Sequence, residues 1–186
     1  MTAPTLDAER TELLEALATA RKALTTTVQG LTDAQAGEHP TVSALCLGGL
    51  IKHVASMEET WMRFAVDGPS AVRHELPEGV TWDDIFAGTR DFPQWMIDHT
   101  EEFQMQPGDT LAEVLARYER VAARTEEILT TIPDLSASHP LPEAPWYEPG
   151  AVFSVRRVLT HLIAETAQHA GHADILRESI DGQTSM

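Results

Sequence analysis

Four polar side chains near the C-terminal end of the sequence share a helical spacing. His161, Glu165, His169 and His172 are four, four and three residues apart. At about 100° per residue, they fall within an arc of about 80° on an α-helix. This stripe borders an apolar face, so we expect it to point into the protein, where such groups are costly unless something satisfies them. A divalent cation would satisfy them, because ligands at i and i+4 converge on one point. Hydrogen bonds among the four side chains are the alternative.

One further histidine lies inside a predicted apolar helix. His53 neighbours Leu50, Val54 and Met57 in the segment from about 45 to 65. A histidine in that setting is more often a core residue with a hydrogen-bond partner than a ligand. Opposite the stripe on the last helix, however, it becomes a natural third ligand for a metal.

Two pairings on the last helix are compatible with a metal. Glu165 and His169 are four residues apart, while His169 and His172 are three apart. Both pairs are helical neighbours, so spacing alone does not choose between them. Charge favours Glu165, because an inward-facing carboxylate is expensive unless it is paired, and a dication pairs it directly.

The other histidines and the single cysteine carry weaker signals. We expect four histidines at the surface, because they lie near predicted loops: His39, His74, His99 and His139. Cys46 lies in an apolar run, which is typical of a buried structural thiol. One cysteine makes no internal disulfide, which fits a reducing compartment.

Four segments with apolar residues at steps of three and four must position these groups. They predict long helices at about 6–30, 44–66, 109–131 and 154–181. The stretches 67–108 and 133–152 are irregular, although 92–97 suggests a short extra helix. No pattern indicates a sheet of three or more strands. The sequence therefore predicts an all-α four-helix bundle with long connections, forming one domain over residues 1–186.

Composition narrows the range of partners. Thirteen Lys and Arg stand against 29 Asp and Glu, a formal charge of −16. Phosphate backbones and anionic membrane surfaces would repel such a chain, so we expect no nucleic-acid or membrane partner. The N-terminus lacks the basic and apolar regions of a signal peptide, and no apolar run approaches the ~20 residues of a membrane span. These features favour a cytoplasmic protein.

Two segments resemble a known protein family. Residues 43–61 resemble the second-helix motif of the DinB-like superfamily, and residues 155–182 resemble its last helix more closely. The closest branch is the actinobacterial one that includes mycothiol-dependent transferases. The resemblance extends over nearly the whole chain. It implies a four-helix bundle, often dimeric, with a metal site of three ligands.

The resemblance also implies which residues hold the metal. Many members carry two histidines four residues apart on the last helix, but the first of those positions is Glu165 here. The mycothiol-dependent maleylpyruvate isomerases, which resemble this family, use His, Glu and His. Carried over, the ligands are His53, Glu165 and His169. Such a set suits zinc with an open fourth position, and nickel, ferrous iron or manganese would bind it as well.

The implied activity is a metal-dependent transfer reaction. A low-molecular-weight thiol, with mycothiol as the first choice, would attack a small electrophile, and His161 and His172 would move protons or face the substrate. A metal-dependent small-molecule hydrolase and a non-catalytic, stress-related metal-binding protein are the alternatives. The resemblance further implies a homodimer, with exposed apolar residues at 92–97 or on the first helix as contacts.

Three charged residues have open roles at this stage. Glu58 lies five residues after His53, so it either orients a ligand or contacts substrate, or it is solvated. Arg157 and Arg177 either meet a carboxylate or a sugar hydroxyl of the substrate, or they are surface charges.

Overall fold

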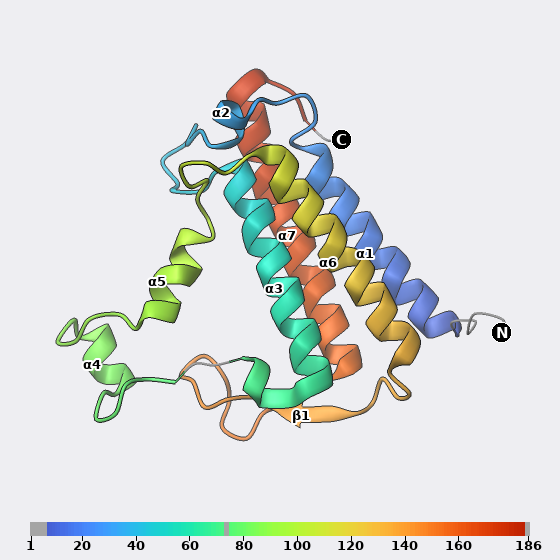
Figure 1. The fold of residues 1–186 in the computed structure, drawn as a ribbon, viewed down its shortest axis with the longest axis vertical. Coiled ribbons are helices and arrows are strands. Elements are labelled where there is room, and N and C mark those ends of the chain that lie inside the picture. Colours follow the sequence, from blue (N-terminus) through green and yellow to red (C-terminus); the bar gives the residue numbers. More distant parts are fainter. Residues whose placement is uncertain (1–6, 73–74, 185–186) are drawn as a thin grey trace.

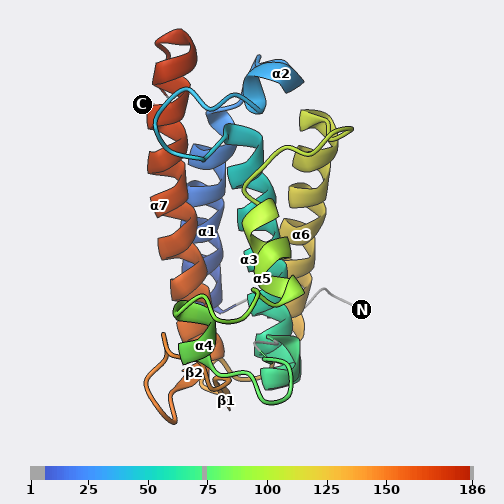
Figure 2. The same cartoon turned by 90° about the vertical axis from the view of Figure 1, so that its left-hand side faces the viewer.

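The computed structural model describes residues 7–72 and 75–184. Its four long helices lie side by side as a bundle (Figures 1 and 2). They are α1 (Ala8–Thr26), α3 (Leu47–Asp67), α6 (Leu111–Thr131) and α7 (Val155–Asp181). Each predicted helix is confirmed, with small shifts at the ends. The all-α class is confirmed too, whereas the assignment of residues 1–186 to a single domain stays a prediction.

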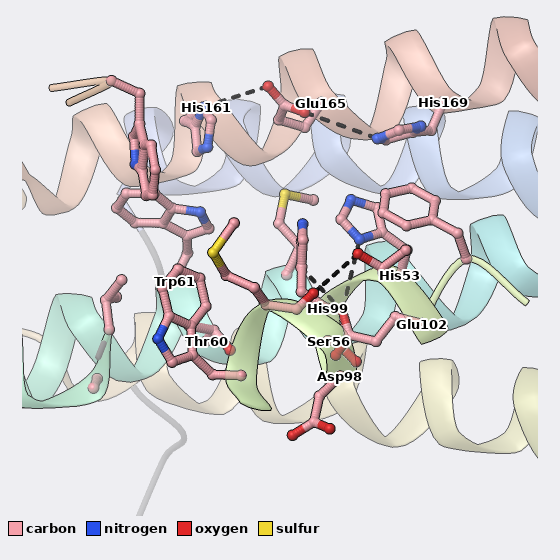
Figure 3. A pocket seen from close by; sticks show the side chains of 18 of the residues that line it. His53, Ser56, Thr60, Trp61, Asp98, His99, Glu102, His161, Glu165 and His169 are labelled. Carbon is pink, nitrogen blue, oxygen red and sulfur yellow. Dashed lines mark hydrogen bonds and ion pairs between the residues drawn. The ribbon is translucent and has the colours of Figure 1, made fainter. Parts of the chain in front are cut away.

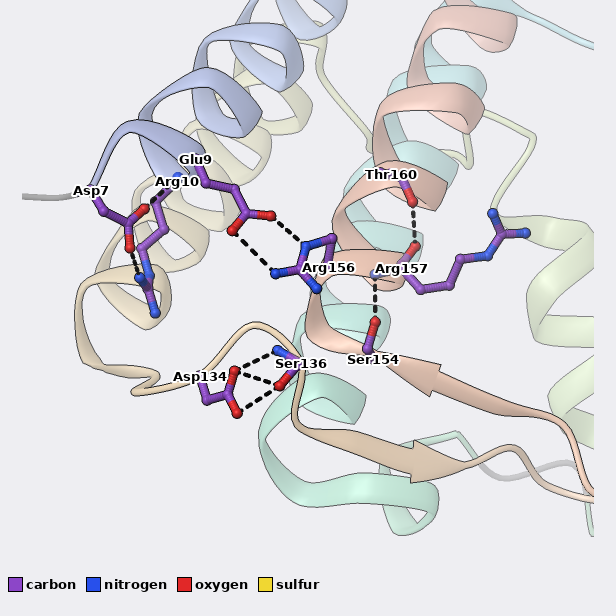
Figure 4. Close-up of polar contacts among 9 residues, drawn as sticks. All are labelled: Asp7, Glu9, Arg10, Asp134, Ser136, Ser154, Arg156, Arg157 and Thr160. Carbon is purple, nitrogen blue, oxygen red and sulfur yellow. Dashed lines mark hydrogen bonds and ion pairs between the residues drawn. The ribbon is translucent and has the colours of Figure 1, made fainter.

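Local chemistry sets where α7 begins and how it is anchored. Ser154 caps the helix, because its Oγ accepts a hydrogen bond from the Arg157 backbone N–H at 3.1 Å (Figure 4). Arg156 pairs with Glu9 in the first turn of α1, which ties the starts of the two helices together. Gly182 ends α7 in the left-handed conformation at φ +77°, which glycine adopts without steric cost. The cap and the ion pair therefore fix the position of the α7 stripe along the axis of the bundle.

The core between the long helices contains one buried ion pair. Glu58 of α3 is fully buried and accepts hydrogen bonds from Arg21 Nε at 3.0 Å and from Thr125 Oγ1 at 2.5 Å. Arg21 comes from α1 and Thr125 from α6, so three helices meet at this carboxylate. Glu58 is therefore a structural residue, and its interpretations as a ligand-orienting, a substrate-contacting or a solvated group are all wrong.

The connections carry shorter elements. These are α2 (Asp33–Ala36), the 3-10 helix η1 (Gly68–Ala71), α4 (Trp82–Phe86), α5 (Gln94–Glu101), and the strands β1 (Ser138–Pro140) and β2 (Val152–Ser154). The extra helix expected near 92–97 is confirmed as α5, which lies outside the bundle on the side of α3 (Figure 1).

The two strands pair antiparallel, with His139 opposite Phe153, and they close one end of the bundle (Figure 1). No strand pair was expected from the sequence, since three residues are too few to show an alternating pattern. The part of the chain that the structure describes contains no sheet of three or more strands, as predicted. Within those same residues, no helix has the length and apolar character needed to cross a membrane.

Candidate metal and substrate site

A cavity of about 790 Å³ lies between α3, α5 and α7. Its size is in the range of small-molecule sites, which is about 300–1,000 Å³. His53, His99, Glu102, Glu165 and His169 gather toward one end, and Trp61 lies at the other end beside His161 (Figure 3). The long connection 133–152, which joins α6 to α7, contributes Trp146 and Tyr147 to the wall.

The α7 stripe supplies three of its four predicted residues to this cavity. His161, Glu165 and His169 line it in succession (Figure 3). Glu165 lies between the two histidines: Oε1 is 3.8 Å from His161 Nδ1, and Oε2 is 3.9 Å from His169 Nε2. His172 is not among the described lining residues; its ring centroid is 5.6 Å from that of His169. His172 is thus placed behind His169.

His53 faces this stripe from α3. The residue is only 6% exposed, and its ring centroid is 5.0 Å from that of His169. The ring also stacks on Phe103 at 3.9 Å, which fixes its plane. The three predicted ligands therefore line the same cavity: His53, Glu165 and His169.

Two residues at the end of α5 complete the polar part of the cavity. Glu102 Oε2 lies 3.7 Å from His53 Nδ1 and 3.5 Å from His99 Nδ1. The His99 side chain is 57% exposed, so its predicted surface position is confirmed, but its ring lies 5.2 Å from His53 and lines the cavity. The sequence pattern indicated no role for His99 at the site, although the residue lines the cavity. Glu102 was missed altogether.

A pair of glycines in α3 explains why Glu102 reaches His53. A Cβ atom added at Gly49 would lie 1.9 Å from Phe103 O, and one at Gly48 would lie 2.4 Å from Met105 Sδ. Glycine inside a helix costs roughly 0.5–1 kcal/mol relative to alanine, so this close approach is obtained at the expense of helix stability. Lys52 adds a hydrogen bond from Nζ to Gln104 O at 2.9 Å. The backbone after α5 is thereby fixed against α3, one turn from His53.

The donor set fits a divalent metal. His53 Nδ1, His169 Nδ1 and His172 Nδ1 are buried and have no hydrogen-bond partner. Buried imidazole nitrogens are normally satisfied by a hydrogen bond, a metal or a water molecule. Within the described residues, the group whose ligand atoms all lie within 4.8 Å of one another is His53, His99 and Glu102. That group shares only His53 with the predicted set; His99 belongs to α5, and Glu102 is the residue that follows it.

The electrostatics of the cavity keep the imidazoles available as ligands. Burial, together with the nearby His53 and His172, lowers the pKa of His169 to about 4. Burial also lowers the pKa of His161. A neutral ring carries the lone pair that a metal needs, whereas a protonated ring does not.

The pKa of the Glu102 carboxyl is also lowered. Burial opposes its ionisation, but contacts with His53, His99 and Ser56 outweigh burial and lower the pKa of Glu102 to about 2. The cavity therefore presents the neutral imidazoles of His161 and His169 and the ionised carboxylate of Glu102.

His39, His139 and Cys46 are not among the residues that line the cavity. His39 is exposed and Cys46 is buried, as predicted. His139 was expected at the surface but is half-buried, with its ring 5.8 Å from that of Phe64. His74 lies outside the described residues.

The two arginines with open roles do not line the cavity either. Arg177 is buried and donates to Thr27 O at 2.8 Å and to Gln29 O at 2.9 Å, so it is a structural residue and neither a substrate contact nor a surface charge. Arg157 is exposed, with its Cζ 5.2 Å from the centroid of the Phe153 ring.

A four-helix bundle with a His and Glu cavity between its helices is the arrangement expected of a DinB-like protein. Residues 12–182 match the family model described as mycothiol S-transferase. This chain belongs to the mycothiol S-transferase family, which confirms the resemblance found in the sequence. No curated protein matches the chain.

Two solved structures share the fold. One is a conserved protein from Enterococcus faecalis, with a TM-score of 0.61, 15% identity, and coverage of 93% of this chain and 97% of that one. The other is the colibactin self-resistance protein ClbS in complex with a double-stranded DNA, with a TM-score of 0.55, 14% identity, and coverage of 91% and 95%. At these identities the likeness supports the fold alone.

Proposed function

We propose that this protein is a metal-dependent transferase that activates a low-molecular-weight thiol, mycothiol, for attack on a small electrophile. One observation carries the proposal. In a chain of the mycothiol S-transferase family, histidines and carboxylates from three helices line a single cavity, with Glu165 between two of the histidines. The family match does not favour the hydrolase or the non-catalytic alternative.

The proposed ligands are His53, Glu165 and His169, with zinc as the ion. A bound dication would lower the pKa of a thiol at its open position and so favour the nucleophilic thiolate. The support for Glu165 is its place between two histidines on the cavity wall, without a Lys or Arg partner in the described structure. A dication would balance that charge.

Glu102 has a different proposed role. Its carboxylate faces His53 Nδ1, which leaves the other ring nitrogen, Nε2, for the metal. Metal-binding histidines commonly donate their second N–H to a carboxylate, which fixes the tautomer and the ring orientation. Glu102 would thus be a positioning residue for His53. Direct ligation by Glu102 and His99 is the competing arrangement, favoured by the close grouping of their ligand atoms with His53.

Proton transfer is assigned to His161. In the reaction, a bond forms between the thiol sulfur and the electrophilic carbon, and the leaving group departs with the electron pair of its own bond. The thiol proton passes to His161, which burial keeps neutral and able to accept it. His172 acts indirectly, because it lies behind His169. We propose it as a positioning residue whose loss lowers activity without emptying the metal site.

A thiol-dependence assay tests the proposal. The zinc-loaded protein is incubated with a chlorinated aromatic electrophile and either mycothiol, glutathione or no thiol, and formation of the thioether is followed by mass spectrometry. We expect turnover with mycothiol, and loss of turnover after chelation and in Glu165→Gln. Equal turnover without thiol would support a hydrolase, and no turnover with a range of electrophiles would support the non-catalytic alternative.

The homodimer remains a proposal. The residues suggested as contacts include Phe92 and Ile97, and both are exposed in the single chain. Sedimentation at micromolar concentration tests it, and a monomer would count against it. The expected cytoplasmic location and the expected lack of nucleic-acid partners also stay predictions.

A further inference from the structure

The end of the cavity opposite the carboxylates gathers the tryptophans of the protein. The sequence has four. Trp61, Trp95 and Trp146 line the cavity, and Trp82 packs behind two of them, with ring centroids 4.9 Å from Trp146 and 6.1 Å from Trp95. Tyr147 joins the three lining tryptophans as a fourth aromatic side chain at this end of the wall. We call the lining part of this group, Trp61, Trp95, Trp146 and Tyr147, the aromatic end.

These rings come from separate segments and are held in different ways. Trp61 of α3 is buried and stacks on Phe153 at 5.4 Å. Trp95 of α5 donates its indole N–H to Glu75 O at 3.1 Å, so its one polar group fixes the ring in place. Trp146 is 47% exposed. A large aromatic side chain that stays half exposed at the mouth of a cavity is typical of a binding surface rather than of a core.

His161 connects the aromatic end to the polar end. Its ring centroid lies 4.9 Å from that of Trp61, and its Nδ1 lies 3.8 Å from Glu165 Oε1 (Figure 3). From His161 to His169 the helix advances eight residues, or about 12 Å. A molecule bound at the aromatic end therefore places one edge beside His161, with the proposed metal ligands Glu165 and His169 about one and two helical turns further along α7.

The charge of the cavity restricts what the aromatic end accepts. The described residues that line the whole cavity include Asp98, Glu102 and Glu165 but no Lys or Arg. The chain as a whole carries a formal charge of −16. A carboxylate or phosphate on the substrate would find no arginine or lysine partner among these residues and would be desolvated at a cost. An uncharged molecule avoids that cost.

We infer that the aromatic end binds the planar, uncharged aromatic body of the electrophile, next to the polar end where the thiol is held. This inference rests on the proposed function. The polar end is the better place for the thiol, because the hydroxyl groups of a sugar-based thiol such as mycothiol need hydrogen-bond partners, which the histidine and carboxylate side chains there supply.

Nuclear magnetic resonance of the four indole N–H groups tests the inference without any reaction. The metal-free protein labelled with ¹⁵N is titrated with 2-naphthol, and separately with its saturated analogue decahydro-2-naphthol, which has the same skeleton and hydroxyl but no flat ring. We expect 2-naphthol to shift the Trp61, Trp95 and Trp146 signals and to bind about tenfold more tightly than the analogue, the scale of aromatic stacking beyond area burial.

Two variants make the test specific. Trp146→Leu keeps an apolar side chain at a half-exposed position, and we expect it to weaken 2-naphthol binding by about tenfold. Phe92→Ala removes an exposed aromatic side chain that does not line the cavity and should leave binding unchanged. Helical circular dichroism confirms that both variants are folded.

The opposite results would overturn the inference. Equal affinity for the two naphthols would show that flatness is not recognised. Displacement of 2-naphthol by mycothiol, with shifts of the same indole signals, would assign the aromatic end to the thiol. Either result leaves the thiol-dependence assay unaffected, so failure of this inference is distinguishable from failure of the proposed function.

Discussion

Two glutamates inside the bundle show how the same side chain is used in opposite ways. Glu58 of α3 is fully buried, and the fold supplies its partners, Arg21 and Thr125. Glu165 of α7 is partly exposed to the cavity, and its described neighbours are His161 and His169, at 3.8 and 3.9 Å. The first carboxylate is satisfied without any ligand, while the second lies among groups that a cation would complete.

The two carboxylates differ in their partners as well as in their burial. An arginine beside a buried carboxylate gives a closed ion pair that leaves no site for a ligand. Neutral histidines beside a carboxylate at a cavity leave lone pairs and a negative charge unused. We therefore expect changes at Glu58 and its partners to act on stability, and changes at Glu165 and its neighbours to act on metal binding.

The largest effect is expected from breaking the closed pair. Arg21→Met leaves the buried Glu58 carboxylate uncompensated, and we expect a loss of about 3–5 kcal/mol in the free energy of unfolding. For a chain of this length the midpoint of thermal unfolding should fall by about 10 °C. Calorimetry measures this, and zinc affinity of the folded variant should be unchanged.

A compensating variant serves as the control for that prediction. Arg21→Met combined with Glu58→Leu replaces the pair by apolar groups and should recover most of the lost stability, because no charge is left buried. If the double variant is as unstable as the single one, the pair is not the source of the loss. If Arg21→Met also empties the metal site, the separation of the two glutamates is wrong.

The second prediction concerns Glu165. Glu165→Gln removes the charge that pairs the dication, and we expect zinc affinity to fall by more than about 100-fold, beyond the effect of losing an orienting group. His172→Ala is the matched control, and it should keep the metal and mainly lower activity. Metal content of the two purified variants, by mass spectrometry, decides. An empty His172→Ala site beside a full Glu165→Gln site would assign the ligand pair to His169 and His172.

The third prediction tests whether Glu102 orients the ligand His53 or binds the metal itself. If its carboxylate orients His53, Glu102→Gln should lower zinc affinity by about 10–100-fold, because an amide still accepts a hydrogen bond but draws the imidazole proton less strongly. Titration against a competing chelator measures this. His99→Ala should have little effect. A loss in both variants as large as that of Glu165→Gln would identify Glu102 and His99 as ligands.

The fold of the bundle could be predicted from the sequence more completely than the candidate site. The four long helices follow from apolar residues at steps of three and four, together with local signals such as Gly182 after α7. Each signal lies within one segment, so the chain alone reveals it. The pairing of Ser138–Pro140 with Val152–Ser154 joins strands of three residues across a long connection, and neither strand carries a pattern of its own.

The candidate site divides in the same way. His161, Glu165 and His169 share one helix, so their spacing places them on one cavity wall. Glu102 and His99 reach His53 only because the backbone after α5 packs against Gly48 and Gly49, which is a tertiary contact. Their i, i+3 spacing was a visible but common signal. Glu58 misled for a similar reason, because its partner Arg21 lies 37 residues earlier in the chain.

The smallest effect concerns pH and separates His169 from the exposed histidines. Burial, with His53 and His172 nearby, lowers the pKa of His169 to about 4, from an ordinary value of 6.5. Between these values the unfolded chain binds more protons than the native protein, so stability is full above pH 6.5 and falls as pH drops toward 4. Solvent in the cavity screens part of the effect, so we expect the free energy of unfolding of the metal-free protein to fall by about 1–2 kcal/mol.

Urea unfolding at pH 7 and pH 4.5 measures this difference in the free energy of unfolding. His169→Asn should reduce it, whereas His39→Asn, at an exposed histidine, should not. An unchanged difference in His169→Asn would mean that His169 is not held neutral by its surroundings.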